Sequence, residues 1–390
     1  MGIAIPMSIR GRSVELNIDS LNYTDIKTRG LRVEINKNIS NHIFTYGIDY
    51  FKDYSDNTDS RSTIMNGFGP SMAQIDTTPQ LPKAEYASFG IFIQDEVTPF
   101  ENFSLVAGLR FQKVKGETFE TPGLEEVKKE ISKNNTFVGT LGLIYKFTPQ
   151  FRTYFSVGRG FRAPNLIENF FNGATPEGRG FQKRNTNLKA ETSLNFDIGV
   201  RYNSGRVYFD GCYFNNKLYD GIRIEETGNR VNGLSEYQNI NVDKLKIEGF
   251  EFSLNINPVK NINFLSNFTK IKSVDIGNKE KPYSDTYGSK FVVGFRYEET
   301  KGTWFEYNIR ISGRSKDVVL ADNPIGEYIP GFTVHNSGFG VELFKGKKYS
   351  QKLIFRLNNI TNKLYSEFSN GSFFRPSKGR NFVISWIGEF

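Results

Sequence analysis

The chain of 390 residues contains one cysteine, Cys212, and two histidines, His42 and His335. A single cysteine excludes an intrachain disulfide, and no C-x-x-C or H-E-x-x-H spacing is present for zinc. The sequence has no G-x-S-x-G elbow and no G-x-G-x-x-G fingerprint, which argues against serine hydrolases and dinucleotide-binding enzymes. We therefore expect no enzyme, no resident metal and no cofactor.

Long apolar runs are also missing. No segment approaches the ~20 apolar residues that a spanning helix needs, and the mean hydropathy is −0.45. Nevertheless, 36 Phe and 19 Tyr bring the aromatic content to 15%. A transmembrane β-barrel reconciles these values, because only alternate residues meet lipid and aromatic side chains gather at strand ends. The net charge of +8 is scattered along the chain and not focused in a stripe, so we expect no nucleic-acid partner.

The last ten residues follow a period of two, with aromatic residues at both ends of one apolar face. Phe382, Ile384, Trp386 and Phe390 share one face of the predicted strand, and the chain stops on the last of them. Successive side chains of a strand point to opposite faces, so this pattern suits lipid on one side and a polar lumen on the other. We predict a closing strand here, with Trp386 and Phe390 as the C-terminal signal for the barrel-assembly machinery.

The same alternation recurs along the whole chain, and it predicts sixteen strands. They are expected at residues 12-20, 29-39, 42-52, 86-97, 103-114, 136-147, 151-160, 193-203, 206-216, 239-257, 262-273, 287-298, 304-313, 332-344, 351-361 and 381-390. The one segment with helical periodicity is 123–133, within a predicted loop.

Short and long connections alternate from residue 86 onward. The short ones are 98–102, 147–150, 203–205, 258–261, 299–303 and 345–350. The long ones are 115-135, 161-192, 217-238, 274-286, 314-331 and 362-380, and loop 53-85 fits the same order. Transmembrane barrels have short periplasmic turns and long extracellular loops. The sequence therefore predicts an all-β, antiparallel, up-and-down transmembrane barrel in the outer membrane.

Two motifs stand at the ends of one long loop. Residues 155–171 read F-S-V-G-R-G-F-R-A-P-N-L-I-E-N-F-F, and residues 185–193 read N-T-N-L-K-A-E-T-S. Together with shorter matches over roughly residues 85–390, this order resembles TonB-dependent outer-membrane receptors. The motif positions that carry the resemblance are Phe161, Arg162, Ala163, Pro164, Asn185, Asn187 and Leu188.

The resemblance implies a plugged barrel of 22 strands, of which this chain would be the C-terminal part with about sixteen. Residues 1–12 have no secretory signal pattern, so we expect a fragment without the plug and the first strands. The implied partners are the TonB energy-coupling protein, through the missing plug, the lipid of the outer membrane, and an iron chelate. A closed sheet pairing 12-20 with 381-390 would instead favour a passive porin, whereas the fragment predicts an unpaired edge near 12-20.

The loop between the motifs has two interpretations. In the first, Pro164 ends the strand and Arg162 holds the base of the loop through charge-assisted hydrogen bonds. In the second, aromatic and basic side chains of loop 165-184 grip an anionic, partly apolar ligand. The candidate ligand-binding residues are Arg162, Phe170, Phe171, Arg179, Phe181, Lys183, Arg184 and His335.

The identity of the cargo stays open at this point. In haem receptors of the family the resemblance implies a histidine between the two motifs, and none lies between Pro164 and Asn185. We therefore rank a siderophore above haem, with cobalamin or a glycan as alternatives. His335 remains a possible axial haem ligand, and a tyrosine can also hold haem iron. A structural or adhesive barrel, or an outer-membrane phospholipase, would be a third class. The tyrosines considered are Tyr283, Tyr287 and Tyr328.

Overall fold

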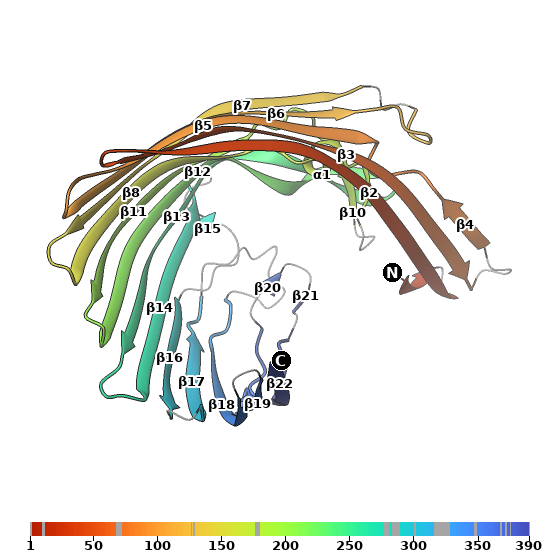
Figure 1. Ribbon diagram of the computed structural model, residues 1–390. Helices are drawn as coiled ribbons and strands as arrows, with labels where there is room; N and C mark the ends of the chain where they lie inside the picture. Colours follow the sequence, from red (N-terminus) through yellow and green to blue (C-terminus); the bar gives the residue numbers. More distant parts are fainter. Residues whose placement is uncertain are drawn as a thin grey trace.

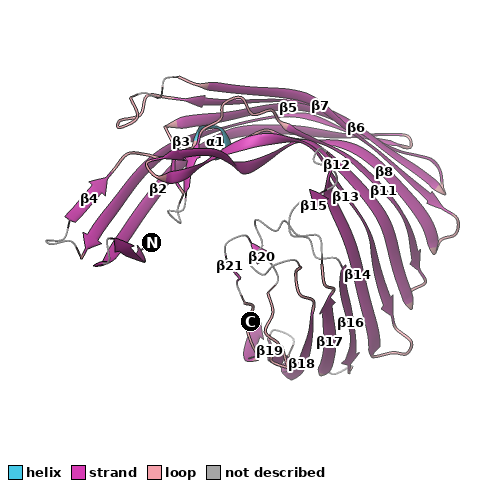
Figure 2. Ribbon diagram, turned by 180° about the vertical axis from the view of Figure 1, so that it is seen from behind, coloured by secondary structure: helices cyan, strands magenta, loops and turns pink. Residues whose placement is uncertain are grey.

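A single large sheet, curved and mainly antiparallel, forms the protein in the computed structural model (Figures 1 and 2). The structure describes residues 2–9, 12–67, 72–125, 127, 129–175, 180–276, 281–282, 289–299, 302–315, 328–346, 349–366, 369–370, 373–374 and 376–389. The all-β, up-and-down prediction is confirmed. Among the described residues, no helix has the length and apolar character needed to cross a membrane.

Long strands, each hydrogen-bonded to the next along the chain, make up the wall. They are β2 (Arg12–Ile39), β3 (His42–Asn66), β5 (Ala84–Phe100), β6 (Phe103–Thr118), β7 (Ile131–Lys146), β8 (Phe151–Arg162), β11 (Glu191–Asn203), β12 (Val207–Val231), β13 (Leu234–Ile256), β14 (Ile262–Asp275), β16 (Ser289–Glu298), β17 (Trp304–Ser312), β18 (Phe332–Lys345), β19 (Ser350–Asn358) and β22 (Asn381–Glu389).

Shorter elements border this wall. They are β1 (Gly2–Ile9), β4 (Met72–Asp76), α1 (Leu166–Phe170), β9 (Gly173–Ala174), β10 (Gly180–Lys183), β15 (Lys281–Pro282), and the separate pair β20 (Ser369–Asn370) and β21 (Phe373–Phe374).

The register places the apolar positions of neighbouring strands on one face. Phe305 pairs with Phe339, Phe339 with Phe355, and Phe355 with Ile384. Residues that pair directly point to the same side of the sheet. Phe382, Ile384 and Trp386 share this outward face with exposed fractions of 58%, 58% and 61%. The predicted facing of these three side chains is confirmed, whereas Phe390 lies outside the described residues.

The inward face is polar. Arg296 pairs with Glu306 across β16 and β17, and the two side chains form an ion pair of 3.1 Å. Further along the wall, Arg110 of β6 binds Asp49 of β3 at 2.8 Å. Facing charges that neutralise one another fit a wall with lipid on one side and a polar lumen on the other.

The prediction of two strands at 12-20 and 29-39 is wrong. Both belong to β2, which pairs with β3 without interruption from Glu15, opposite Asn66, to Ile39, opposite His42. Because β3 continues to Asn66, much of the predicted loop 53-85 is also strand. The residues between the two apolar runs are polar because this part of the pairing extends beyond the lipid-facing band.

The predicted loop 217-238 is likewise mostly strand. The strands β12 and β13 continue to Val231 and Leu234, so only Asn232 and Gly233 form the turn. Their φ angles of 51° and 82° are both positive, as a type I′ turn requires. The Asn-Gly pair is therefore the sequence signal of a hairpin turn. The long hairpin was not predicted because the residues on both sides of this pair are mostly polar.

The helical periodicity of segment 123–133 is not realised in its described residues. Gly123 and Glu125 lie in turns, and β7 has already begun at Ile131. The helix α1 lies elsewhere, at Leu166–Phe170 in the loop between β8 and β11, and the sequence pattern did not predict it. Leu124 and Val127 are buried, and the Val127 N–H donates to the Leu124 carbonyl at 2.9 Å, so their spacing reflects a buried turn and not a helical face.

The sheet is open in both views of the molecule (Figures 1 and 2). Among the described residues, β22 pairs with β19 alone, and β2 pairs with β1 and β3. The predicted unpaired edge is present, but it lies at residues 20–39, because β1 covers Arg12 to Asp19. The pairing of 12-20 with 381-390 that would have favoured a porin is not formed in the described part of the chain.

One consequence of close strand packing can be tested at Gly249 in β13. A Cβ atom added there would lie 2.1 Å from the Lys270 carbonyl oxygen and 2.7 Å from Cζ of Phe214. We expect Gly249→Val to lower the free energy of unfolding by about 1–3 kcal/mol, because backbone cannot move away as a flexible side chain can. Urea titration of folded protein in lipid vesicles measures the change. Gly142→Val is the matched control, since its added Cβ meets nothing closer than 3.9 Å.

Candidate functional site

The two sequence motifs meet at one end of the wall, where β8 ends and β11 begins. Arg162, the last residue of β8, pairs in register with Glu191, the first residue of β11. Both side chains lie on the inward face, because they share the parity of Ser156 and Asp197, whose side chains are hydrogen-bonded across the same strands. The described parts of the intervening segment, residues 163–175 and 180–190, fold back over the concave side of the sheet, where α1 and β10 lie (Figure 1).

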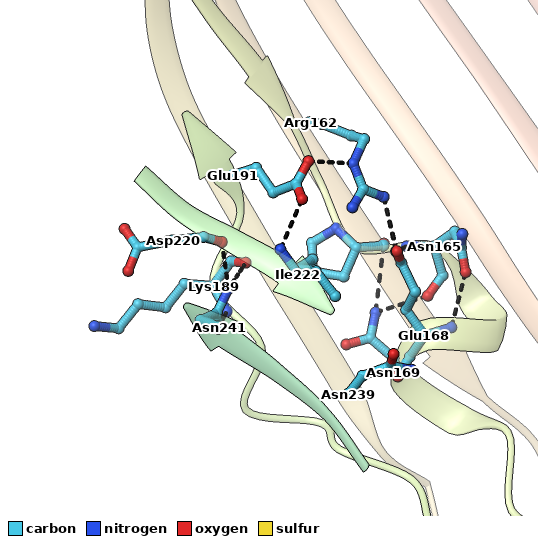
Figure 3. Close-up of polar contacts among 11 residues, drawn as sticks. Arg162, Asn165, Glu168, Asn169, Lys189, Glu191, Asp220, Ile222, Asn239 and Asn241 are labelled. Carbon is cyan, nitrogen blue, oxygen red and sulfur yellow. Dashed lines mark hydrogen bonds and ion pairs between the residues drawn. The ribbon is translucent and has the colours of Figure 1, made fainter. Parts of the chain in front are cut away.

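Arg162 is the centre of the polar network in Figure 3. Its Nε atom donates to Glu191, and its Nη1 atom donates to both carboxylate oxygens of Glu168 at 2.9 Å. The second oxygen of Glu191 accepts from the backbone N–H of Ile222 at 2.7 Å. One guanidinium thus joins the end of β8, the helix α1, the start of β11 and the strand β12, which is the structural role that the sequence predicted for Arg162.

The helix α1 is held at its start by a capping box. The Asn165 side chain accepts from the Glu168 N–H at 2.8 Å, and the Glu168 carboxylate accepts from the Asn165 N–H at 2.8 Å. Pro164 precedes this cap and has no N–H to donate, so it ends the ladder of β8. The Asn169 side chain then donates to the carbonyl oxygens of Pro164 and Asn165. The motif F-R-A-P-N therefore turns the chain from strand into helix.

The second motif is fastened to β13. Asn185 donates to the Asn239 carbonyl at 2.8 Å, and its own Oδ1 atom accepts from the N–H of Asn187. Asn241 accepts from the Lys189 N–H at 2.8 Å and donates to the Lys189 carbonyl at 3.0 Å. These contacts satisfy backbone groups that no strand pairing reaches. We call Arg162, Glu168, Glu191, Asn239 and Asn241 the loop latch.

Electrostatics favour the charged state of the latch. The hydrogen bond from Arg162 to Glu191 raises the pKa of the guanidinium, in spite of its partial burial. Burial raises the pKa of Glu191, but Arg162 and the Ile222 N–H outweigh it and hold that pKa below 4.5. Both groups therefore stay ionised at neutral pH, so the latch is closed under ordinary conditions.

Most of the predicted ligand-binding residues are engaged with the protein itself. Phe170 is fully buried and lies 3.3 Å from a Cβ position at Gly116, so this conformation does not present it to a ligand. Lys183 forms an ion pair of 3.5 Å with Glu236. Beside it, β10 adds to β13 as a parallel strand over Gly180 to Lys183.

The remaining predicted loop residues differ in their access to solvent. Arg184 contacts Glu130 at 3.3 Å and is about a quarter exposed. Phe171 and Phe181 are half-buried, and Leu188 is buried. Arg179 lies outside the described residues. Phe171, Phe181 and the half-exposed Lys183 are therefore the loop residues that stay partly accessible.

His335 lies on β18, away from this loop. Its Nδ1 atom is 2.7 Å from the Tyr307 hydroxyl, and its strand position pairs with Ile309. It has the parity of Phe339, so it is on the outward face and not among the polar side chains that line the lumen. Tyr328 stacks against Arg314 at 3.6 Å, while Tyr283 and Tyr287 lie outside the described residues.

Sequence reasoning did not identify Glu191, Asn239 and Asn241 as parts of this site. Asn239 and Asn241 stand two apart on β13, with Ile240 between them. Polar residues at alternate positions beyond the lipid-facing band were the available signal, since they share one face of a strand. Their partners in the loop, Glu168, Asn185 and Lys189, lie 52 or more positions away in the chain, so only the folded sheet brings them together.

This fold and latch define the class as the wall of an outer-membrane receptor barrel. The family model described as TonB dependent receptor-like, beta-barrel matches residues 9–362. The chain belongs to this family, and its place is the outer membrane of a Gram-negative type of bacterium.

Comparisons with individual proteins agree. An uncharacterized TonB-dependent receptor of Haemophilus influenzae is 26% identical over 318 residues, which cover 73% of this chain and 80% of that protein. The ferrienterobactin receptor of Escherichia coli is 25% identical over 247 residues, 59% of this chain and 30% of that receptor. The copper transporter OprC superposes with a TM-score of 0.77 at 14% identity, over 97% of this chain and 61% of OprC, a similarity of fold alone.

Proposed function

We propose that the protein is the wall portion of a receptor that imports an iron complex across the outer membrane with energy from TonB. The observation that carries the proposal is the latched loop 163–190, which lies on the concave side of the sheet at the end with the long connections. A cargo that enters from outside would meet this loop first. The similarity to a ferrienterobactin receptor supports iron as the metal.

We further propose that this sheet is the C-terminal part of a larger barrel that encloses a plug. The unpaired edges at β2 and β22 support additional strands between them, because open edges are not tolerated in lipid. The share of the larger relatives that the chain covers, 30% and 61%, is consistent with that arrangement. Contact with TonB would then depend on the plug.

A siderophore ranks above haem as the cargo. No histidine lies between the two motifs, and His335 forms a hydrogen bond with Tyr307 on the outward face. Phe171, Phe181 and Lys183 are instead partly accessible and offer apolar and cationic contacts, which suit an anionic metal chelate. Cobalamin and a glycan are weaker candidates, because neither requires the cations that the loop presents.

The deciding experiment measures binding and uptake in cells that carry the full-length receptor. Ferric catecholate, ferric hydroxamate and ferric citrate complexes, haem, cobalamin and a copper chelate are compared at equal concentration. We expect saturable binding of one ferric siderophore, and uptake that is lost in cells without TonB. Phe181→Ala combined with Lys183→Ala should weaken binding about tenfold or more, since aromatic and charged contacts each contribute about 1 kcal/mol.

Lys189→Ala is the matched control for this pair. Its side chain is exposed in the same loop, while its contacts with Asn241 are made by the backbone. Unchanged binding in the double variant would remove the loop from the site. Uptake of haem that depends on His335, or uptake of a non-iron cargo alone, would contradict the ranking of a siderophore above the other cargoes. Uptake in cells without TonB would favour the passive porin instead.

A further inference from the structure

A row of asparagines crosses the inward face of the last strands of the wall. Asn308 of β17 pairs with Asn336 of β18, and Asn358 of β19 pairs with Asn381 of β22. The Asn336 side chain donates to Asn308 at 2.9 Å, and the Asn358 side chain donates to Asn381 at 3.0 Å. Asn308 lies on the same face of β17 as Glu306, which belongs to the polar inward face. We call these four residues the asparagine row.

The asparagine row lines an open pocket of about 500 Å³, a volume in the range of small-molecule sites. Asn358 is the last residue of β19 and Asn381 is the first of β22, so the pocket lies at the end of the wall with the long connections. The four strands that carry the row are neighbours in the sheet (Figure 1). The other lining residues are Glu306, Ser337, Arg356, Asn359, Tyr365, Lys378 and Val383.

The shape of the pocket is fixed by contacts of the connection between β19 and β22. Asn359 is 2% exposed, and its side chain donates to the carbonyl oxygens of Lys363 at 2.9 Å and of Lys378 at 3.3 Å. These bonds hold the two ends of the connection together. The Tyr365 hydroxyl accepts from Arg310 of β17 at 3.1 Å, which fastens the connection to the wall. Because the lining is in place before a ligand arrives, binding costs less conformational entropy.

The pocket has a surplus of positive charge and of hydrogen-bond donors. Arg356 and Lys378 form no ion pair among the described residues. Glu306, the one carboxylate of the lining, is neutralised by Arg296 at 3.1 Å. The Asn308 amide nitrogen has no acceptor in the part of the chain that the structure describes. A guanidinium binds a carboxylate through two parallel hydrogen bonds, and an ammonium binds it as a point charge, so an anion with several oxygen atoms fits this lining.

The same lining favours carboxylate and hydroxyl groups over catechol rings. The Asn358 amide oxygen has no donor among the described residues, so it can accept from a hydroxyl group or a water molecule of the ligand. Tyr365 is the one aromatic side chain among the described lining residues. Its ring already contacts Phe332, with centroids 4.5 Å apart, and the guanidinium of Arg310. Stacking of a catechol ring in this pocket is therefore disfavoured.

We propose that the pocket binds a ferric complex of an α-hydroxycarboxylate, which makes this class of chelate the cargo. The inference rests on the proposed function in iron uptake. Carboxylates of the ligand pair with Arg356 and Lys378, and the Asn308 amide donates to a further ligand oxygen. A hydroxyl group or an iron-bound water molecule donates to Asn358. The pocket belongs to β17–β22 and the loop latch to β8–β13, so this recognition uses residues separate from the latch.

The test measures the binding of ferric citrate, a ferric catecholate and a ferric hydroxamate to the full-length receptor in nanodiscs by isothermal titration calorimetry. We expect ferric citrate to bind most tightly. Arg356→Gln with Lys378→Gln should weaken its binding about tenfold or more, because two charge-assisted contacts are lost. Asn308→Asp should weaken it by a similar factor, since the new carboxylate still accepts from Asn336 and so preserves the fold but repels an anion.

Lys352→Gln with Lys363→Gln is the matched control and should leave binding unchanged. Lys352 is on the same strand as Arg356, and Lys363 is in the same connection as Lys378, but neither lines the pocket. Equal weakening by the two double variants, or unchanged binding in Asn308→Asp, would overturn the pocket as the site. Tight binding of the catecholate or hydroxamate complex without ferric citrate would overturn the ligand class and leave iron uptake in place. Failure of every ferric complex to bind would contradict the proposed function, and this inference with it.

Discussion

Arg162→Ala is expected to release residues 163–190 from the concave side of the wall. The change leaves the carboxylates of Glu168 and Glu191 without their cation, and both side chains are less than one-fifth exposed. Leaving such groups unpaired makes the free energy of loop docking less favourable by about 1–3 kcal/mol. The loss is no larger because Arg162 is 44% exposed, so that solvent screens its charge. Hydrogen exchange of the loop should rise strongly, and cargo binding should fall with it.

Two variants distinguish the latch from general damage. Arg162→Lys keeps a positive charge but cannot contact Glu168 and Glu191 with a planar fork, so it should rescue the loop only in part. Arg152→Ala removes an inward arginine from the opposite end of β8 and should leave exchange in the loop unchanged. Normal protection of residues 163–190 in Arg162→Ala would show that the hydrogen-bonding asparagines hold the loop without it.

Acid should act in the same direction as Arg162→Ala. Because the folded-state pKa of Glu191 is held below 4.5, its contribution to loop docking is fully present above that pH. It is lost as the pH falls through the lowered value and the carboxylate gains a proton. Loop exchange that increases in the wild type as the pH falls below the ordinary pKa of a glutamate, but is already raised and less pH-dependent in Glu191→Gln, would agree with this assignment.

Ile384→Arg is expected to be the most destabilising substitution in the last strand. The side chain is 58% exposed on the outward face and pairs with Phe355. It lies about five residues from the end of β22, which places it roughly 13 Å into an apolar band of ~25 Å. A cation near the midplane of the bilayer lowers the free energy of unfolding by about 2–4 kcal/mol. Equilibrium unfolding of the lipid-inserted protein measures the loss.

Ser385→Arg is the control for the outward orientation of Ile384. Ser385 is the next residue of β22 and points to the polar side, where it pairs with Ile354. Its cost should therefore be below about 1 kcal/mol. Trp386→Arg should fall between the two, because Trp386 lies nearer the short-turn end and the cost of a cation decreases toward the interface. Equal stability of Ile384→Arg and Ser385→Arg would mean that the two faces have been assigned to the wrong sides.

The sequence predicted the parts of the wall that meet lipid. Strands such as 103-114 and 193-203 lie within β6 and β11 because every second residue must be apolar over the whole height of the bilayer. It failed where strands leave the lipid. The polar stretch between 20 and 29 was taken as a break, but backbone pairing with β3 continues there without any apolar requirement.

The motif residues divide in a similar way. Pro164 and Arg162 were assigned their roles from local chemistry, since proline cannot extend a ladder and an arginine binds two carboxylates at once. The burial of Phe170 was not predictable, because an aromatic residue in a loop looks the same whether it meets solvent or Gly116. His335 shows the same limit, since its face depends on the register of β17 and β18.

The sequence alone thus determined three features. Alternation of apolar and polar residues assigned an outward and an inward face to each strand. The order of short and long connections predicted an up-and-down sheet and its location in the outer membrane. These features repeat every two residues or every hairpin, so a short stretch of sequence is enough to detect them. Tertiary structure alone decided which loop residues are latched, which are buried, and that four asparagines of β17, β18, β19 and β22 stand in one row. Register between strands sets those neighbours, because a hydrogen-bonded ladder joins residues that are far apart in the chain.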